Sequence, residues 1–309
     1  MVSMKFDNYP SVDAFCDSLR LQFPYFAGVI QKQIDSFGDH WLKLFEDELK
    51  IFFSQDRKRI DQAVMGYGKF SLDSMKLQVK FQKTKEYENK TYEEAASEVY
   101  QNKEYMFGLY LPGILLSHYL WRHHFLQHVF FLEKFLPLVG GGDGKVFYDI
   151  GVGTGFYSKE MVTRTKLKGK GFDLSPHSLA HTLMLLGAHN VAERYEANLR
   201  DIIKEPVTPA ADYLVNIEVL EHLEDPQMFL NSLAKMLKPG GYGLISAAIN
   251  APNADHVYLY RNSDEVASQL VKAGFEIVDS TVDAAYAPRS EGELVPVNVA
   301  FIVTRKEGK

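Results

Sequence analysis

The sequence predicts an α/β protein in which a helical region precedes a mainly parallel sheet. Its 309 residues are enough for two domains of ordinary size. The composition changes at a glycine cluster in residues 140–144: of the 40 Phe, Tyr and Trp residues, 26 lie in 1–140 and 14 in 141–309. We therefore expect a helical domain over 1–140 and a second domain over 141–309.

The first region has the apolar spacing of amphipathic helices. Apolar residues recur every three or four positions in 15–23, 30–53 and 114–136, which indicates helices packed on a shared core. Segment 80–106 mixes charges with irregularly spaced tyrosines, and we interpret it as a solvated helix face.

The second region alternates short apolar runs with amphipathic stretches. The runs predict strands at 145–150, 168–174, 192–198, 211–219, 242–249, 275–282 and 297–304. Helices are expected between them at 156–165, 176–188, 226–237 and 263–274. This alternation predicts a mainly parallel sheet covered on both faces. Only a loop separates the last two strands, which suggests an antiparallel edge strand.

Composition excludes several classes of protein. The net charge is −6 and neither region has a basic excess, which disfavours nucleic acid as a partner. The single cysteine, Cys16, fits a reducing compartment, and acids near the start occupy positions where an export signal needs apolar residues. No apolar run reaches the ~18–20 residues of a membrane span. We expect a cytoplasmic protein.

A glycine turn follows the first predicted strand, in Asp149-Ile-Gly151-Val-Gly153-Thr-Gly155. Such a turn lets a ligand approach the backbone, and the helix after it presents free N–H groups. The dinucleotide fingerprint requires Gly or Ala at the sixth position, where this chain has Phe156. The pattern here is instead Gly-x-Gly-x-Gly preceded by an acid.

The second predicted strand ends at Asp173, about 20 residues further on. An acid at that separation can accept hydrogen bonds from both ribose hydroxyls. The alternative is that Asp173 only caps the helix that starts near Pro176.

Together these motifs resemble the class I S-adenosylmethionine-dependent methyltransferases over about residues 145–309. DIGVGTG, GFDLSP, EANLRDI, IEVLEHLEDP and LKPGGYGLIS carry the resemblance. It implies a Rossmann-like sheet, S-adenosylmethionine as cofactor with S-adenosylhomocysteine as product, and no metal. It further implies the following cofactor-binding residues: Asp149, Gly151, Gly153, Gly155, Asp173, Leu174, Asn198, Leu199 and Glu218.

Two histidines are candidate catalytic residues. His222 follows the fourth predicted strand and His256 lies in the loop after the fifth, so both should face the crevice at the carboxyl ends of the strands. An imidazole can accept a hydroxyl proton near neutral pH. His222 could instead position the acceptor or the cofactor, or serve structure alone. Loop polarity is the simpler explanation for His256.

Four more histidines, 118, 123, 124 and 128, lie in the helical region. His124 and His128 are one helical turn apart and could share a metal ion, but no carboxylate pattern accompanies them, so we expect ordinary core or surface histidines. Tyr110, Tyr119 and Trp121 could line a substrate pocket, although aromatic residues at helical spacing more often form core.

The leading functional hypothesis is methylation of a small, largely apolar or aromatic metabolite, in specialised metabolism. We expect oxygen as the acceptor atom before nitrogen or carbon, because a hydroxyl needs a base and two histidines are candidates. The aromatic-rich helical region would form a lid over the cofactor crevice and could contribute to a homodimer interface. The alternatives are a methyltransferase acting on protein or, less in keeping with the charge, RNA, and a non-catalytic subunit that binds the cofactor.

Overall fold

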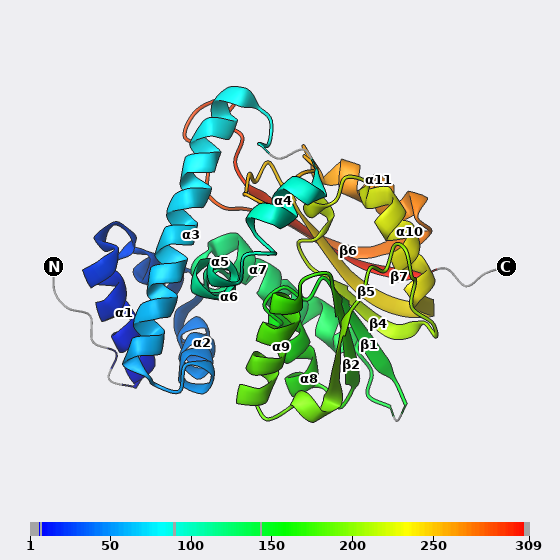
Figure 1. The fold of residues 1–309 in the computed structure, drawn as a ribbon, viewed down its shortest axis with the longest axis horizontal. Helices are drawn as coiled ribbons and strands as arrows, with labels where there is room; N and C mark the ends of the chain where they lie inside the picture. The colour runs from blue at the N-terminus through cyan, green and yellow to red at the C-terminus, as the bar shows by residue number, and fades with distance from the viewer. Residues whose placement is uncertain (1–5, 7, 89–90, 143, 306–309) are drawn as a thin grey trace.

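The computed structural model describes residues 6, 8–88, 91–142 and 144–305. Seven strands form one sheet in the order β3-β2-β1-β4-β5-β7-β6 (Figure 1). Their bounds are β1 Val146–Ile150, β2 Lys168–Asp173, β3 Tyr195–Leu199, β4 Ala211–Asn216, β5 Leu237–Ile249, β6 Phe275–Ala284 and β7 Val297–Arg305. The first five strands pair in parallel, and β7 lies antiparallel between β5 and β6. The predicted fold class is confirmed.

Helices cover both faces of the sheet because successive strand residues point to opposite sides. The helices are α8 Phe156–Arg164 and α9 Pro176–Ala188, and α10 Pro226–Met236 and α11 Ser263–Lys272. Phe147 and Val215 belong to the apolar cluster that includes α8 and α9, whereas Tyr148 and Leu214 join the cluster of α10 and α11. Figure 1 shows the two helix pairs on opposite sides of the sheet. All four helices and all seven strands fall where the sequence predicts them.

The residues before the sheet are mainly helical. The helices are α1 Pro10–Gln22, α2 Val29–Phe52, α3 Arg57–Thr84, α4 Tyr92–Glu98, α5 Lys103–Tyr105, α6 Leu111–Leu120 and α7 Arg122–Phe130. Short π-helical turns, η2 Met106–Tyr110 and η3 Phe131–Phe135, flank α6 and α7. Gly38, with φ 63°, breaks α2. No helix in the described ranges is long and apolar enough to cross a membrane.

The interpretation of 80–106 as one solvated helix face is wrong. The helix α3 ends at Thr84, and Lys85 takes left-handed backbone angles (φ 58°) that terminate it. Beyond this point the side chains turn inward: Tyr87 and Val99 are buried. The many charged residues of segment 80–106 therefore led to a prediction of solvent exposure for residues that are in fact buried.

The apolar core crosses the expected boundary at residue 140. One cluster joins Phe45 of α2 and Phe125 of α7 to Phe156 of α8 and to Leu244 and Ile302 of the sheet. This packing fixes the helical region against the face that α8 and α9 also cover. The division into domains at 140 stays a prediction.

Candidate active site

A cavity of about 830 Å³ lies at the carboxyl ends of the strands. Small-molecule pockets usually measure about 300–1,000 Å³, so this cavity can hold a cofactor together with a second molecule. One wall comes from the glycine turn and the ends of β2, β4 and β5. The opposite wall comes from the helical region, with Phe26, Tyr67, Phe70, Tyr92, Tyr100, Tyr110 and Trp121.

The glycine turn has the backbone that the sequence indicated. Gly151, Gly153 and Gly155 have φ of 73°, 53° and 81°, in the left-handed region that favours glycine. A Cβ on Gly151 would lie 2.4 Å from a methyl of Val219, and one on Gly155 would lie 2.7 Å from Thr182. A Cβ on Gly153 would meet no protein atom within 4 Å. Gly153 lines the cavity, so its open side faces the ligand space.

Asp149 and Asp173 support this turn from the ends of two neighbouring strands. Asp149 is buried and accepts a hydrogen bond from the Ser158 hydroxyl, and burial raises its pKa to about 7. The carboxylate of Asp173 accepts from the backbone N–H of Gly153 at 3.3 Å and of Ser175 at 2.7 Å. Burial raises the pKa of Asp173 to about 6. Both residues line the cavity.

The other expected cofactor residues differ in position. Leu174 is 45% exposed and lines the cavity. Asn198 does not line it, and its amide donates to the carbonyls of Gly171 and Glu196. Leu199 is 62% exposed and also lies outside the lining.

The cavity is lined instead by residues that follow Leu199 directly. Asp201 and Ile202 reach it, in the same EANLRDI stretch but two or three positions later. Asp201 also accepts from the N–H of Ile203 at 3.0 Å, which shapes the loop. The sequence contained this signal as an acid with an apolar neighbour just after β3.

Glu218 lies two residues after the end of β4 in a strained backbone conformation, with φ 54°. Its carboxylate accepts from the Ser246 hydroxyl at 2.8 Å, and its own N–H donates to that hydroxyl oxygen at 3.0 Å. Burial raises its pKa to about 7. Glu218 lines the cavity beside the glycine turn.

His222 ends the short helical turn η6 (Leu220–His222) and also lines the cavity. Its Nε2 lies 3.1 Å from the Glu218 carbonyl oxygen and its Nδ1 2.9 Å from the Asp255 carbonyl oxygen. A neutral imidazole has one N–H, so only one of these contacts can be a hydrogen bond. The backbone therefore competes with any substrate for this ring.

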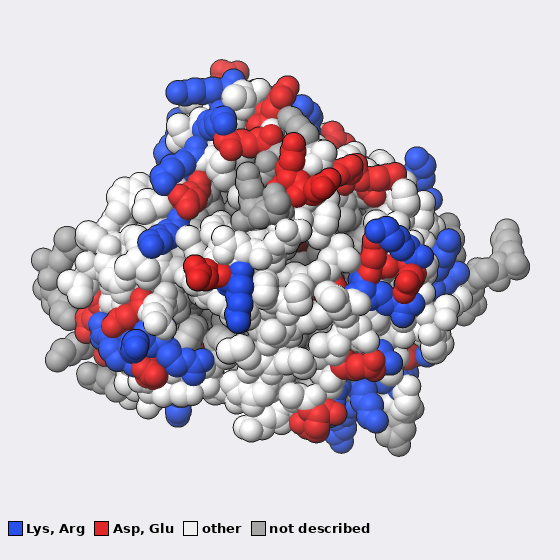
Figure 2. Space-filling view, in the orientation of Figure 1, with Lys and Arg blue, Asp and Glu red and all other residues white. Residues whose placement is uncertain are grey.

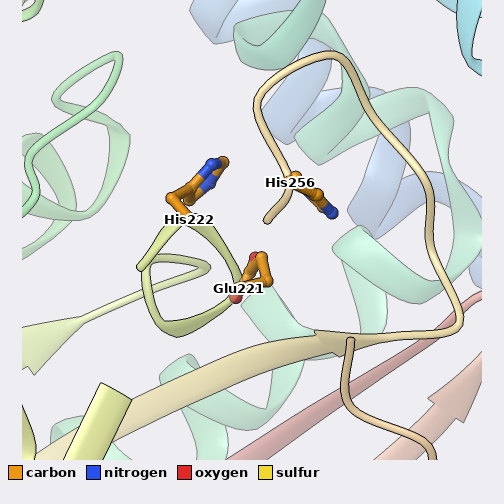
Figure 3. A group of neighbouring side chains, drawn as sticks. All are labelled: Glu221, His222 and His256. Carbon is orange, nitrogen blue, oxygen red and sulfur yellow. The ribbon is translucent and has the colours of Figure 1, made fainter. Parts of the chain in front are cut away.

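His256 and Glu221 lie next to His222 (Figure 3). The rings of His222 and His256 are 4.8 Å apart between centroids. Burial and the neighbouring His222 lower the pKa of His256 to about 3, so this imidazole is neutral. Glu221 is fully buried. Burial, and secondly the negative charge of Glu218, raise the pKa of Glu221 well above its ordinary value. Both side chains line the cavity.

Asp255 connects this group to the helical region, and sequence analysis missed it. Its fully buried carboxylate accepts from the hydroxyl of Tyr100 at 2.8 Å and from that of Tyr110. It also lies 3.3 Å from Nδ1 of His222. Two tyrosines from before residue 140 therefore contact the loop that follows β5.

The four histidines at 118–128 are all buried. The first three line the cavity, and burial lowers the pKa of His118 and of His123 to about 3. His128 instead lies 3.2 Å from Glu160, outside the cavity. Of the aromatic candidates, Tyr110 and Trp121 line the cavity, whereas Tyr119 donates to Glu48 in the core.

The residues present fit the cofactor that the motifs imply. The open side of Gly153 leaves room for close backbone approach, and Asp173 reaches the same cavity. A carboxylate there can accept from ribose hydroxyls, and Asp201 with Ile202 supplies a polar and an apolar contact further along the wall. These groups belong to one continuous cavity.

Comparison with known proteins supports the same class. Residues 148–242 match the family model described as a methyltransferase domain. The ubiquinone biosynthesis O-methyltransferase of Neisseria meningitidis is 29% identical over 112 residues, which are 36% of this chain and 47% of that protein. Phosphoethanolamine N-methyltransferase 2 of Caenorhabditis elegans is 27% identical over 143 residues, 43% of this chain and 32% of that protein. The chain spans about half the length of the first of these relatives.

Solved structures show the fold. An O-methyltransferase family protein of Burkholderia thailandensis has a TM-score of 0.54 at 16% identity, covering 81% of this chain and 73% of that one. The N-methyltransferase NodS of Bradyrhizobium japonicum, in complex with S-adenosylhomocysteine, has a TM-score of 0.52 at 19% identity, and the match covers 67% of this chain and 98% of that one. The family model places a methyltransferase domain at residues 148–242, and the seven-stranded sheet is consistent with the fold of class I methyltransferases. S-adenosylmethionine is the cofactor of that class, and the relatives named include both O- and N-methyltransferases.

Proposed function

We propose that the protein transfers a methyl group from S-adenosylmethionine to a small, largely apolar or aromatic metabolite, with a hydroxyl oxygen as the favoured acceptor. The observation that carries the proposal is the single cavity that has the glycine turn on one wall and aromatic side chains on the other. Tyr67 and Phe70 are only 2% exposed, so this aromatic wall belongs to the interior. An apolar molecule bound there would gain from leaving water.

The two walls have separate roles in this proposal. Gly153, Asp173 and the loop at Asp201 hold the cofactor, while the helical region encloses the acceptor and excludes water. Methyl transfer is an in-line displacement, so alignment of the two reactants and exclusion of water are the main contributions of the protein. Residues 1–140 would then provide the acceptor wall, as the predicted lid requires.

Oxygen is favoured because the polar groups of the cavity gather at one place. Glu221, His222 and His256 line it together. All three can hold a hydroxyl by hydrogen bonds, and Glu221 or His222 can accept its proton. The similarity to a ubiquinone biosynthesis O-methyltransferase supports this choice of atom. The similarity to a phosphoethanolamine N-methyltransferase keeps nitrogen as the alternative.

The test uses methyl-labelled S-adenosylmethionine with the purified chain and a cell extract separated into small-molecule and protein fractions. We expect label in the small-molecule fraction, and a matched Asp173→Ala variant should lose it. Label in protein alone would overturn the metabolite hypothesis and support a protein acceptor. Tight binding of S-adenosylhomocysteine with no labelled product would favour a non-catalytic subunit.

Charge on the visible surface agrees with a small acceptor. Figure 2 shows Lys and Arg interspersed with Asp and Glu on the face drawn, and acidic groups gathered along its upper edge near α4. A phosphate backbone would need a continuous basic stripe there.

A further inference from the structure

Three buried histidines lie close together in the cavity wall that the helical region provides. His118 belongs to α6, whereas His123 and His124 lie at the start of α7. Trp121 interrupts the two helices with extended backbone angles (φ −97°, ψ 123°). The ring centroids of His123 and His124 are 4.5 Å apart, and those of His118 and His124 are 5.8 Å apart. The three rings therefore place polar atoms together in a mainly aromatic wall.

The hydroxyl of Ser117 fixes the proton position on His124. This hydroxyl donates to the carbonyl oxygen of Ile114 at 2.7 Å, and its oxygen lies 2.9 Å from Nδ1 of His124. A hydroxyl has one hydrogen and a carbonyl can only accept, so Nδ1 carries the proton of the second contact and donates it to Ser117. Burial holds the pKa of His124 well below its ordinary value, so the ring is neutral. Nε2 of His124 is therefore a hydrogen-bond acceptor.

The other two rings offer donors instead. Nδ1 of His118 and Nδ1 of His123 are buried and have no hydrogen-bond partner among the described residues. A buried N–H without an acceptor is rarer in folded proteins than an unpaired acceptor, so we expect the ring proton of each on Nε2. Nε2 of each ring also lacks a partner in the described part of the chain, but it is not closed off from the cavity as Nδ1 is. The wall thus presents two N–H donors and one acceptor.

Aromatic rings surround these nitrogens. Phe156 stacks on His118 at 4.2 Å between centroids. Trp121 stacks on His123 at 5.8 Å and meets His124 edge-on at 4.9 Å. Burial lowers the pKa of all three imidazoles, so none of them is charged near neutral pH. These surroundings favour an aromatic ring with an uncharged polar group, because a carboxylate would lose its hydration without gaining a charged partner from this group.

We propose that His118, His123 and His124 form a subsite, the histidine subsite, that binds an uncharged hydroxyl on an aromatic ring of the methyl acceptor. A phenolic hydroxyl has two lone pairs and one hydrogen, which match two N–H donors and one acceptor. This assignment rests on the proposed function and narrows the acceptor to a phenol, whichever of its atoms receives the methyl group. The helical region then selects the acceptor as well as enclosing it.

The test compares three probes of one shape on the full chain with S-adenosylhomocysteine bound, so that no methyl transfer takes place. The probes are β-naphthol, naphthalene and β-naphthoate, which carry a hydroxyl, no polar group and a carboxylate. Calorimetric titration measures each Kd. We expect β-naphthol to bind about tenfold more tightly than naphthalene, as hydrogen bonds to buried neutral groups would give, and β-naphthoate to bind more weakly than β-naphthol.

Two outcomes with the probes would overturn the assignment. One is an equal Kd for β-naphthol and naphthalene, which would mean that the hydroxyl finds no partner. The other is tighter binding of β-naphthoate than of β-naphthol. That result would indicate pairing with a cation of the cavity wall, such as the exposed Arg122, in place of the neutral rings.

Two variants change the histidine subsite, and a third is their matched control. His124→Phe keeps a ring and removes the acceptor nitrogen, while Ser117→Ala removes the hydroxyl that fixes the proton position. Both should reduce the preference for β-naphthol over naphthalene to about twofold or less. Ser74→Ala is the control, because Ser74 also lines the cavity and its hydroxyl donates to a carbonyl of its own helix, that of Phe70. It should keep the wild-type preference, and a preference unchanged in His124→Phe would refute the subsite.

NMR of the histidine side-chain nitrogens reads the proton positions directly, which a purely structural role of Ser117 would not alter. In the wild type, Nδ1 of His124 should be protonated and Nε2 unprotonated, and β-naphthol should shift the Nε2 signal. Ser117→Ala should increase the population with the proton on Nε2, whereas Ser74→Ala should not. A wild-type His124 with its proton on Nε2 would contradict the assignment even without a bound probe.

Binding of S-adenosylhomocysteine is titrated first in the same samples, and thermal denaturation checks that each variant is folded. Wild type that binds S-adenosylhomocysteine but does not prefer β-naphthol would refute the histidine subsite and leave the proposed methyltransferase function intact. Folded wild type that does not bind S-adenosylhomocysteine would instead contradict the proposed function. If His124→Phe does not fold, the probe series and Ser117→Ala still decide the question.

Discussion

Replacing Gly153 by alanine tests whether the cofactor lies against the glycine turn. The new methyl group would meet no protein atom within 4 Å, so packing of the protein itself is not disturbed. The φ of 53° makes an L-residue costly there, by about 1–2 kcal/mol. Part of the expected loss of stability is therefore backbone strain alone.

Gly144→Ala separates that strain from any effect on the ligand. Gly144 has φ 85°, also meets no atom within 4 Å, and lies just before β1 at the opposite end of the strand. Both variants should lose similar stability. Only Gly153→Ala places a methyl group in the cavity, because only Gly153 lines it.

The size of the effect follows from overpacking. An added methyl in a filled space costs about 1–3 kcal/mol. At about 1.4 kcal/mol per factor of ten, the Kd for S-adenosylhomocysteine should rise about 5- to 150-fold. Calorimetric titration measures the Kd, and thermal denaturation measures stability. A Gly153→Ala protein that is folded and binds within twofold of Gly144→Ala would refute the placement of the cofactor.

Three further predictions concern other groups. The pKa of Asp173 is raised to about 6, so its carboxylate takes a proton as the pH falls through 6. In binding titrations between pH 8 and pH 5, cofactor affinity should therefore decrease near pH 6. Asp173→Asn should bind the cofactor weakly at every pH, without this decrease near pH 6. Buried Glu48 lies 2.8 Å from Lys159, which outweighs burial and lowers the pKa of Glu48 to about 2. Glu48→Gln should lower the free energy of unfolding, measured with denaturant, by about 3–5 kcal/mol. The stabilisation by the Glu48 carboxylate in the wild type should be full above about pH 4.5 and should vanish as the pH falls through 2. Equal stability of the two proteins near neutral pH would contradict this prediction. His222→Ala should lower turnover strongly with cofactor affinity nearly intact in steady-state assays, and unchanged turnover would remove His222 as a catalytic residue.

The sheet and the glycine turn could be predicted because their determinants are local. The DIGVGTG stretch specifies three positive-φ positions through residue type alone, and all three occur. Asp173 follows from the strand that ends beside this turn. Short apolar runs located every strand, although β5 begins at Leu237 rather than at Tyr242.

The polar half of the cavity could not be predicted in the same way. Asp255 appears in the sequence as one acid in a polar loop, yet Tyr100 and Tyr110 contact it across about 150 positions of chain. Its burial depends on that long-range packing, which no local pattern records. Asn198 is the opposite case, a residue expected at the cofactor that does not line the cavity. The sequence cannot show that its amide donates hydrogen bonds to two neighbouring backbone carbonyls.

The aromatic excess of residues 1–140 has two physical origins, and only one concerns a ligand. Many of these rings are core, fully buried away from the cavity, among them Phe15, Trp41, Phe45, Phe125, Phe131 and Phe135. A smaller set, including Tyr67, Phe70, Tyr110 and Trp121, lines the cavity. Composition counts both sets alike, because burial in a core and burial against a ligand select the same residue types. Support for an apolar acceptor therefore comes from the second set alone, and from its position opposite the glycine turn.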